Sequence, residues 1–200
     1  DGSIAWPAVD IRDWYDEKRD ETITIVGDKL MESAPDGTTR QLFTVWDYED
    51  PERHDQWSAA FYDQGFDWTH ANGVHYSPER DSYLLSLGHV DAIYELDRTT
   101  GTPIQRIDSD WVMRGNHVFT FQHDPHWTDD DTLMMMSYTD GVSPVAVEYT
   151  VDTDNERMVE VWSDAIDQEG LTMLGQARRL PDGNIPVSYT HLTLPTIREV

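Results

Sequence analysis

The stretch that decides the fold is 82–107, which reads SYLLSLGHVDAIYELDRTTGTPIQRI. It contains three mainly apolar runs, at 82–87, 93–96 and 103–107, and a polar turn at 97–101 joins the last two. Alternation of apolar and polar residues between turns rich in Asp and Gly is typical of β-hairpins. We therefore expect consecutive antiparallel strands in this stretch.

The same pattern occurs three times along the chain, which makes the internal repeat the main guide to the fold. Glu32, Glu95 and Glu148 fall at matching places in the three copies. A further hairpin is expected before each copy and contributes strands at 22–26, 82–87 and 132–136. The repeated strand pairs lie at 30–33 with 41–46, at 93–96 with 103–107, and at 147–150 with 158–162.

Two hairpins per repeat, at a spacing of about 50–60 residues, are the pattern of β-propeller blades. The chain is therefore predicted to be all-β and to hold about three four-stranded blades, with the start of another copy at 175–184. A β-sandwich is the alternative architecture. Residues 10–20 are strongly charged, and we expect them to form a loop or one short helix.

The charge of the chain restricts its partners. Its 39 acidic and 14 basic residues give a formal net charge of -25, and the lysines are Lys18 and Lys29 alone. This composition favours a halophilic protein, because concentrated salt screens the self-repulsion. No basic run is present to neutralise phosphates, so nucleic acid and anionic membranes are not expected as partners. The lack of cysteine excludes disulfides and thiolate nucleophiles.

The C-terminal tail differs from the rest of the sequence. Residues 187–196 read VSYTHLTLPT and contain no acidic residue. This run resembles the in-frame translation of a transposase-end adapter used in short-read library preparation. We therefore expect a partial propeller at 1–185 and a non-native tail at 186–200, which indicates a fragment of metagenomic origin. No apolar run approaches the ~20 residues of a membrane span, so no membrane insertion is expected.

Two histidines hold equivalent places in consecutive repeats. His70 and His123 each lie at or just before the first strand of a repeat, where propeller blades converge on their axis. Imidazole there can act as nucleophile, proton carrier or oxyanion partner. The neighbouring amides of Asn72 and Gln122 are expected to donate hydrogen bonds to a substrate.

Other polar residues near these histidines are candidates for supporting roles. Asp67 and Asp124 can orient an imidazole by accepting its second N–H. Arg114 and His117 precede His123 on the loop into its blade and are expected to supply positive charge to a bound substrate. A metal site built from the histidines at 70, 75, 123 and 126 is an alternative, but no tight ligand motif supports it, and no metal or cofactor is expected.

These motifs together resemble the arylsulfotransferase (ASST) family. The resemblance is carried by DWTHANGV at 67–74, YLLS at 83–86, FQHD at 121–124 and GQARRLPDGN at 175–184, in that order. It spans about residues 66–185. The family fold is a six-bladed propeller, so the resemblance implies that this chain is about half of one.

The resemblance implies transfer of a sulfuryl group from an aryl sulfate ester to a phenol, through a sulfated histidine and without a nucleotide donor. It gives catalytic roles to His70 and His123 and implies an extracellular or cell-surface location. The arginine that the family carries after the second histidine motif is replaced by Ser143-Pro144-Val145-Ala146. The family's nucleophilic histidine has no match at 172–175. A non-catalytic propeller that binds a ligand or partner is therefore the alternative function, and a quinone-dependent dehydrogenase is a third.

Overall fold

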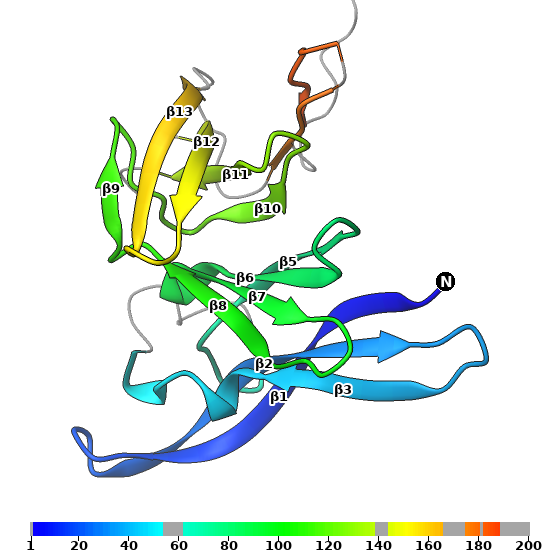
Figure 1. Cartoon of the computed structure of the whole chain (residues 1–200). Coiled ribbons are helices and arrows are strands. Elements are labelled where there is room, and N and C mark those ends of the chain that lie inside the picture. The colour runs from blue at the N-terminus through cyan, green and yellow to red at the C-terminus, as the bar shows by residue number, and fades with distance from the viewer. Residues whose placement is uncertain (1, 54–61, 139–143, 166–174, 181, 189–200) are drawn as a thin grey trace, which may run out of the picture.

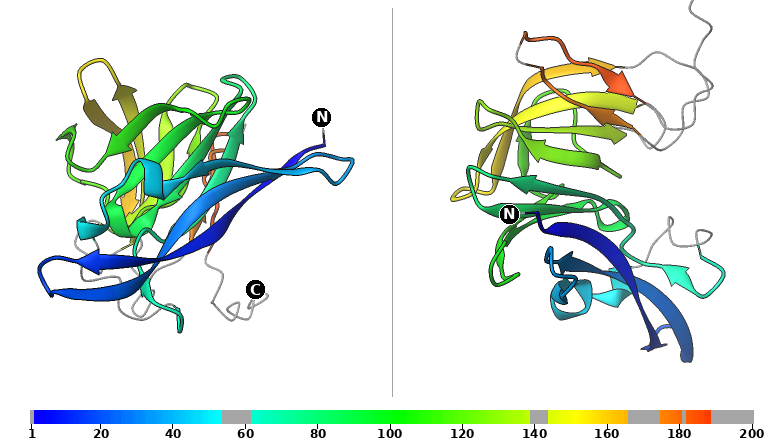
Figure 2. Two further views of the ribbon diagram at one scale, coloured as in Figure 1. Left: turned by 90° about the horizontal axis from the view of Figure 1, so that it is seen from below. Right: turned by 90° about the vertical axis from the view of Figure 1, so that its right-hand side faces the viewer.

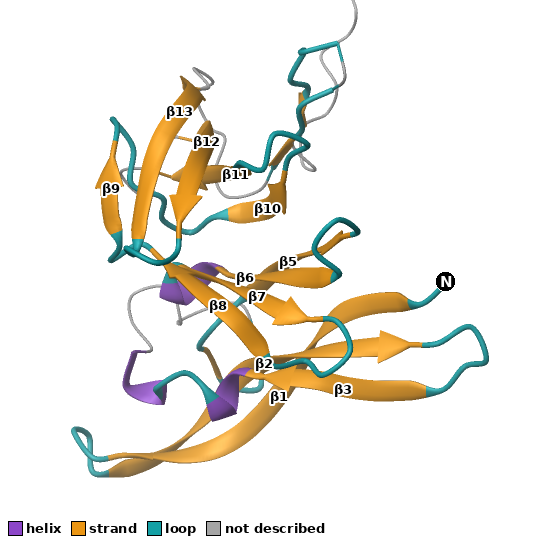
Figure 3. Cartoon of the chain, in the orientation of Figure 1, coloured by secondary structure: helices purple, strands orange, loops and turns teal. Residues whose placement is uncertain are grey.

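The structure is a computed structural model, and it describes residues 2–53, 62–138, 144–165, 175–180 and 182–188. Its described residues form β-strands joined by turns, with three short 3-10 turns and no α-helix (Figure 3). The 3-10 turns are η1 (Val45–Asp47), η2 (Pro51–Arg53) and η3 (Gly88–Val90). Among these residues, no helix is long and apolar enough to cross a membrane.

The strands form three larger sheets, which follow one another along the chain and pack face to face, and one small fourth sheet (Figures 1 and 2). The first sheet contains β1 (Ile4–Asp16), β2 (Glu21–Ser33), β3 (Thr39–Thr44) and β4 (Phe66–Asp67). The second contains β5 (Ala71–Ser77), β6 (Ser82–Leu87), β7 (Ala92–Asp97) and β8 (Pro103–Asp108). The third contains β9 (Val112–Arg114), β10 (His123–Trp127), β11 (Leu133–Tyr138), β12 (Pro144–Asp152) and β13 (Arg157–Ala165). The fourth pairs β14 (Gln176–Ala177) with β15 (Val187–Ser188).

The structure confirms the expected all-β class and the repeated hairpins. The second sheet is a four-stranded antiparallel meander, β5-β6-β7-β8, and the third repeats this order as β10-β11-β12-β13. Within the part of the chain that the structure describes, no sheet closes on itself, so closure into a propeller stays a prediction. Residues 189–200 of the expected tail lie outside the described residues, and Val187 and Ser188 pair with β14.

The N-terminal hairpin corrects two expectations. Residues 10–16 form neither a loop nor a helix, because they continue β1, which pairs with β2 without interruption from Ile4↔Ser33 to Asp16↔Glu21. Residues 22–26 are not a separate strand either, since they belong to the 13-residue strand β2. Apolar Ile23 and Ile25 are buried on β2, whereas β1 exposes apolar Val9 and Ile11 and buries Asp16, so its sequence does not alternate in the usual way.

Two parallel additions to the sheets were not expected from the sequence. β4 pairs with β2 and β9 pairs with β13. Each involves a strand of only two or three residues, too short to show a periodic pattern. The first sheet is therefore not a copy of the other two.

The core lies between the sheets. Strand β6 is buried along its whole length, so it reads as a continuous apolar run with few polar residues. Leu85 packs with Ile25 and Leu30 of the first sheet, while the adjacent Leu84 packs with Met135 and Val147 of the third. Complete burial of such a side chain is worth about 1.5–3 kcal/mol. The second sheet thus joins its neighbours through its two faces.

The repeated glutamates explain why the copies match in sequence. Glu32, Glu95 and Glu148 are all buried, and each accepts a hydrogen bond from a hydroxyl group and contacts an arginine, which compensates for the cost of burying charge. The hydroxyl donors are Tyr83, Ser82 and Thr132, and the arginines are Arg40 with Arg98, Arg80 and Arg179, respectively.

A substitution at Gly101 tests how closely the turn between β7 and β8 approaches strand β3 of the first sheet. Its φ is +74°, and a Cβ there would lie 1.9 Å from the carbonyl oxygen of Leu42 in β3. We expect Gly101→Ala to lower the free energy of unfolding by about 2–4 kcal/mol, measured by urea denaturation. Gly37→Ala is the matched control, because Gly37 has φ +85° and nothing within 4 Å. It should cost only about 1–2 kcal/mol for the backbone alone. Equal losses in the two variants would contradict the close approach.

Candidate functional site

The candidate site lies where the chain enters β5 and β10, the first strands of the second and third sheets. These two strands contact each other, and a Cβ on Gly73 of β5 would lie 3.2 Å from the backbone nitrogen of Asp124 in β10. His70 precedes β5 with φ +52°, and Phe121 precedes β10 with φ +44°. Non-glycine residues rarely adopt this left-handed conformation, which persists where surrounding contacts enforce it.

A carboxylate from the preceding sheet holds each of these loops; that of Asp28 is buried, and that of Asp91 is partly exposed. Asp28 of β2 accepts hydrogen bonds from the Thr69 hydroxyl and the Ala71 backbone N–H, both at 2.7 Å. Asp91, at the end of η3, accepts one from the Phe121 backbone N–H at 2.5 Å. The two aspartates hold equivalent sequence positions, four residues before Glu32 and Glu95. The repeat therefore encodes the anchors of both histidine loops.

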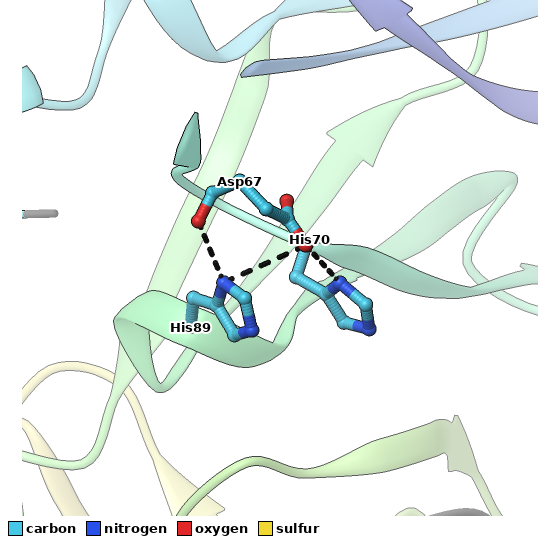
Figure 4. Close-up of side chains that lie close together, drawn as sticks. All are labelled: Asp67, His70 and His89. Carbon is cyan, nitrogen blue, oxygen red and sulfur yellow. Dashed lines mark hydrogen bonds and ion pairs between the residues drawn. The ribbon is translucent and has the colours of Figure 1, made fainter. Parts of the chain in front are cut away.

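Asp67 contacts the imidazole rings of His70 and His89 (Figure 4). Its Oδ2 lies 2.5 Å from Nδ1 of His70, and its backbone oxygen lies 2.9 Å from Nδ1 of His89. The same Oδ2 is 3.8 Å from the His89 nitrogen. The two rings stack with centroids 4.5 Å apart and planes inclined by 16°. Asp67 and His89 are buried, so the group is largely shielded from water.

These contacts fix where the ring protons are. A carbonyl oxygen only accepts, so His89 carries a proton on Nδ1. The Asp67 carboxylate likewise accepts from Nδ1 of His70, so the neutral form of His70 has its lone pair on Nε2. This is the arrangement in which a carboxylate orients an imidazole and fixes its tautomer. The structure therefore supports the expected orienting role of Asp67.

His123 joins this group from the other loop. Burial, together with the charge of His70, lowers the pKa of His123 to about 4, so its ring is neutral at pH 7. Its Nε2 is buried and makes no hydrogen bond with any described residue. The Phe121 ring lies 5.5 Å from that of His70 and 6.3 Å from that of His123. The structure thus brings the two predicted histidines into one neighbourhood.

The amide nitrogens of Asn72 and Gln122 are engaged within the protein. Gln122 is fully buried, and its Nε2 donates to Ser86 Oγ and to the backbone oxygens of Leu87 and Ala92. Asn72 donates from Nδ2 to the Gln122 backbone oxygen at 2.8 Å. Their side-chain oxygens are buried without a hydrogen bond to the described residues. The two amides therefore join the loops, and what they offer a ligand is an acceptor oxygen.

Arg114 and His117 lie elsewhere. Arg114 is exposed in β9, a strand and not a loop, and pairs beside Val159 of β13, at the opposite edge of the third sheet from β10. Four strand spacings separate these edges, which is about 19 Å. His117 contacts Glu160 of β13 through its backbone N–H and, at 3.2 Å, through Nδ1. The structure does not bring either residue to the Asp67 group.

The Asp67 group is also the place where a metal ion has to be considered. Ligand atoms of Asp67, His70 and His89 lie within 4.8 Å of one another. However, an imidazole lone pair lies in the ring plane, and the planes of the two stacked rings are almost parallel, so their lone pairs do not converge on one point. Both Nδ1 atoms also carry protons in the observed hydrogen bonds. This geometry suits proton relay better than metal binding.

His89, Asp28 and Asp91 are the residues that sequence reasoning missed or undervalued. Asp28 and Asp91 carry a detectable signal, because their spacing equals that of Glu32 and Glu95. His89 carries none, since a single histidine after an apolar strand is most often structural. Its position beside His70 results from the fold alone.

The comparison with known families gives the family of the chain. The family model described as Arylsulfotransferase (ASST) matches residues 6–110, more than half of the chain. The chain belongs to the arylsulfotransferase family. The match includes the N-terminal hairpin and the Asp67 group but ends before His123, whereas the resemblance seen in the sequence began only near residue 66. A search of curated proteins found no match.

Asp28 makes the stability of the fold depend on pH. Burial raises the pKa of Asp28 to about 6, although hydrogen bonds from Thr69 and Ala71 oppose the shift. Because the folded state then holds this proton more firmly than the unfolded chain, the contribution of Asp28 is lost as pH rises from about 4 to about 6, by roughly 3 kcal/mol.

The variant Asp28→Asn keeps an acceptor oxygen and removes this titration. We expect it to gain about 2–3 kcal/mol over the wild type at pH 7.5 relative to the difference at pH 4. Urea denaturation at the two pH values measures this gain, and the exposed substitution Asp130→Asn serves as the control. A difference between variant and wild type that does not change with pH would rule out the buried titration.

Proposed function

We propose that this protein is an aryl sulfotransferase that moves a sulfuryl group from an aryl sulfate ester to a phenolic acceptor through a sulfated histidine. Membership of the arylsulfotransferase family supports the reaction class. The observation that carries the proposal is the 2.5 Å contact between Asp67 and His70, because it orients an imidazole whose Nε2 can exchange a proton with the phenol oxygen. The nucleophilic histidine of the family is a different residue, which has no match at 172–175.

In the first half of the reaction, the nucleophilic histidine of the family attacks the sulfur of the ester. An N–S bond forms, the S–O bond to the aryl group breaks, and the aryl oxygen leaves with the bonding electrons and takes a proton from Nε2 of His70. In the second half, the oxygen of the acceptor phenol attacks the sulfur, its proton passes to Nε2 of His70, the N–S bond breaks, and the neutral nucleophile is restored. The Asp67 carboxylate stabilises the His70 ring while it carries this proton, in a site shielded from water.

His123 is the proposed partner of His70. It is neutral and buried, and its Nε2 lacks a hydrogen-bond partner among the described residues, so a bound substrate would supply the missing contact. We assign it the hydrogen bond to the ester or phenol oxygen. Burying a polar atom without a partner costs about 1–3 kcal/mol, and substrate binding would recover part of this.

Further parts of the proposal follow from family membership and from the stack of sheets. We propose that the sheets are blades of a six-bladed propeller, with β5 and β10 facing its axis, and that the protein acts outside the cell or at its surface. Asn72 and Gln122 would contact substrate through their oxygens. The positions of Arg114 and His117 give no support to substrate contacts by these two residues.

A single substitution tests the role of His70. We expect His70→Gln to lower kcat for transfer from 4-nitrophenyl sulfate to phenol by a factor of about 10³, because the proton carrier is lost. The protein should be expressed from its complete reading frame and checked for folding by circular dichroism. Quenched wild-type reactions should also contain a labile sulfuryl adduct on a histidine other than His70.

His75→Gln is the matched control, because His75 lies on the same strand, β5, five residues further along. It should retain the adduct and most of the activity. Turnover that persists unchanged in His70→Gln would refute the assignment of the proton carrier to His70. Ligand binding without turnover in the wild type would favour the alternative of a non-catalytic binding propeller.

A further inference from the structure

A cleft of about 610 Å³ lies toward the other end of strands β5 and β10 from the Asp67 group. We propose that it is a second binding site, which takes a monoanionic sulfate ester or sulfonate and holds it with Arg178 beside two imidazoles. His75 of β5 follows Ala71 by four residues, which is about 13 Å of extended strand. The cleft is therefore separate from the site of the proposed reaction, and ligand binding there does not require that reaction.

The repeat brings one basic side chain from each of three neighbouring sheets to this cleft. His75 pairs with the β6 residue opposite Glu95, and His126 pairs with the β11 residue opposite Glu148, so the two histidines hold equivalent positions. Their ring centroids are 5.5 Å apart, and the ring planes are inclined by 58°. β10 also contacts β14 of the fourth sheet, and Arg178 directly follows β14. All three side chains line the cleft.

Arg178 supplies the positive charge that an anion requires. Its side chain is 40% exposed, and its guanidinium bonds to the Asp124 carboxylate through Nη2 alone, at 3.2 and 3.1 Å from the two oxygens. Within the described part of the chain, no residue accepts a hydrogen bond from Nε or Nη1 of Arg178. These N–H groups therefore remain for the oxygens of a ligand, and guanidinium is the side-chain cation best suited to oxyanions.

The two imidazoles suit an anion better than a metal ion. Burial and the charge of Arg178 lower the pKa of His75 to about 4, and burial also lowers the pKa of His126, so both rings are neutral at pH 7. The charge of Arg178 would repel a metal cation in the same way. His126 donates from Nδ1 to the Asp124 backbone oxygen at 3.1 Å, so its Nε2 is the atom that can take up a proton beside a bound anion. Binding of an anion should therefore tighten as pH falls.

The other charged groups at the cleft restrict the charge of the ligand. The charge of Arg179 is paired with buried Glu148, which also acts on His126. Three exposed carboxylates line the rim, those of Glu79, Asp129 and Asp130. Exposed charges are screened by salt, whereas Arg178 would contact the ligand directly. The rim still disfavours a dianion such as a phosphate monoester more than a sulfate monoester, which carries one charge.

The cleft is larger than a free sulfate ion requires, so the ligand is expected to carry an organic group. Pro78, Trp127 and Leu180 line the cleft and offer apolar surface to that group. A mostly apolar lining with a few polar groups that fix orientation is typical of sites for small organic molecules.

NMR of ring-labelled histidine in the full chain tests this site with 4-toluenesulfonate, a monoanion whose C–S bond prevents sulfuryl transfer. We expect saturable shifts of the His75 and His126 ring signals, which His75→Gln and His126→Gln assign. Binding should be about 3–10-fold tighter at pH 5.5 than at pH 7.5, because the bound anion favours protonated imidazole. Phenyl phosphate, which is mainly a dianion at pH 7.5, should bind about tenfold more weakly than 4-toluenesulfonate.

Substitution of Arg178 decides whether this arginine holds the anion. Arg178→Gln should weaken 4-toluenesulfonate binding by about tenfold or more, and Arg178→Lys, which keeps the charge, should weaken it less. Arg114→Gln is the matched control, because it removes the same charge from an exposed position at the far edge of the third sheet, and it should bind like the wild type. Circular dichroism checks the folding of each variant, and Arg178→Lys serves alone if Arg178→Gln does not fold.

Three results would overturn the second site. One is equal binding by the Arg178 variants and Arg114→Gln. Another is binding that disappears in His70→Gln and persists in the Arg178 variants, which would place the ligand at the Asp67 group. The third is a pair of imidazole signals that respond to Zn²⁺ and not to 4-toluenesulfonate, which would make the cleft a metal site. A wild type without sulfuryl transfer would refute the proposed function and leave the binding result unchanged.

Discussion

The candidate site depends on one constraint, which is that a carboxylate of the preceding sheet accepts hydrogen bonds from each histidine loop. Asp28 binds the loop that carries His70, and Asp91 binds the loop before His123. Without these acceptors, the backbone N–H groups in the loops would be unsatisfied and the left-handed conformations would relax. The same contacts set the position of one sheet on the next, so the architecture and the site share their anchors.

Buried carboxylates make this arrangement costly. The chain carries a net charge of -25, and its sequence places most acidic residues where water and salt can screen them. Asp28 and Asp67 are different, because they are buried, and the charge of Asp67 adds to the cost of ionising Asp28. Functional sites often contain buried charges that lower the stability of the fold, because a charge fixed in place stabilises the charge that develops during the reaction. The negative charge of Asp67 therefore stabilises positive charge that forms on the His70 ring.

Much of the fold and part of the site could be predicted from the sequence. The alternation in 82–107 and its repeat at 132–162 correctly predict strands β6, β7 and β8 of the second sheet and β11, β12 and β13 of the third, because a period of two is a local property. The same rule failed for β1, where charged Asp10 and Arg12 hide a strand that is paired over its full length. The repeat also indicated His70 and His123, and the structure places them in one neighbourhood.

The sequence by itself determined the β class, the hairpins, the equivalence of the two histidine loops and the family. Those properties follow from short-range patterns and from motifs in order. Only the tertiary structure decided that His89 stacks on His70 and that Arg114 lies at the far edge of the third sheet. The physical reason is that contacts between separate segments depend on how whole sheets pack, and packing depends on shape and buried charge that no local period records.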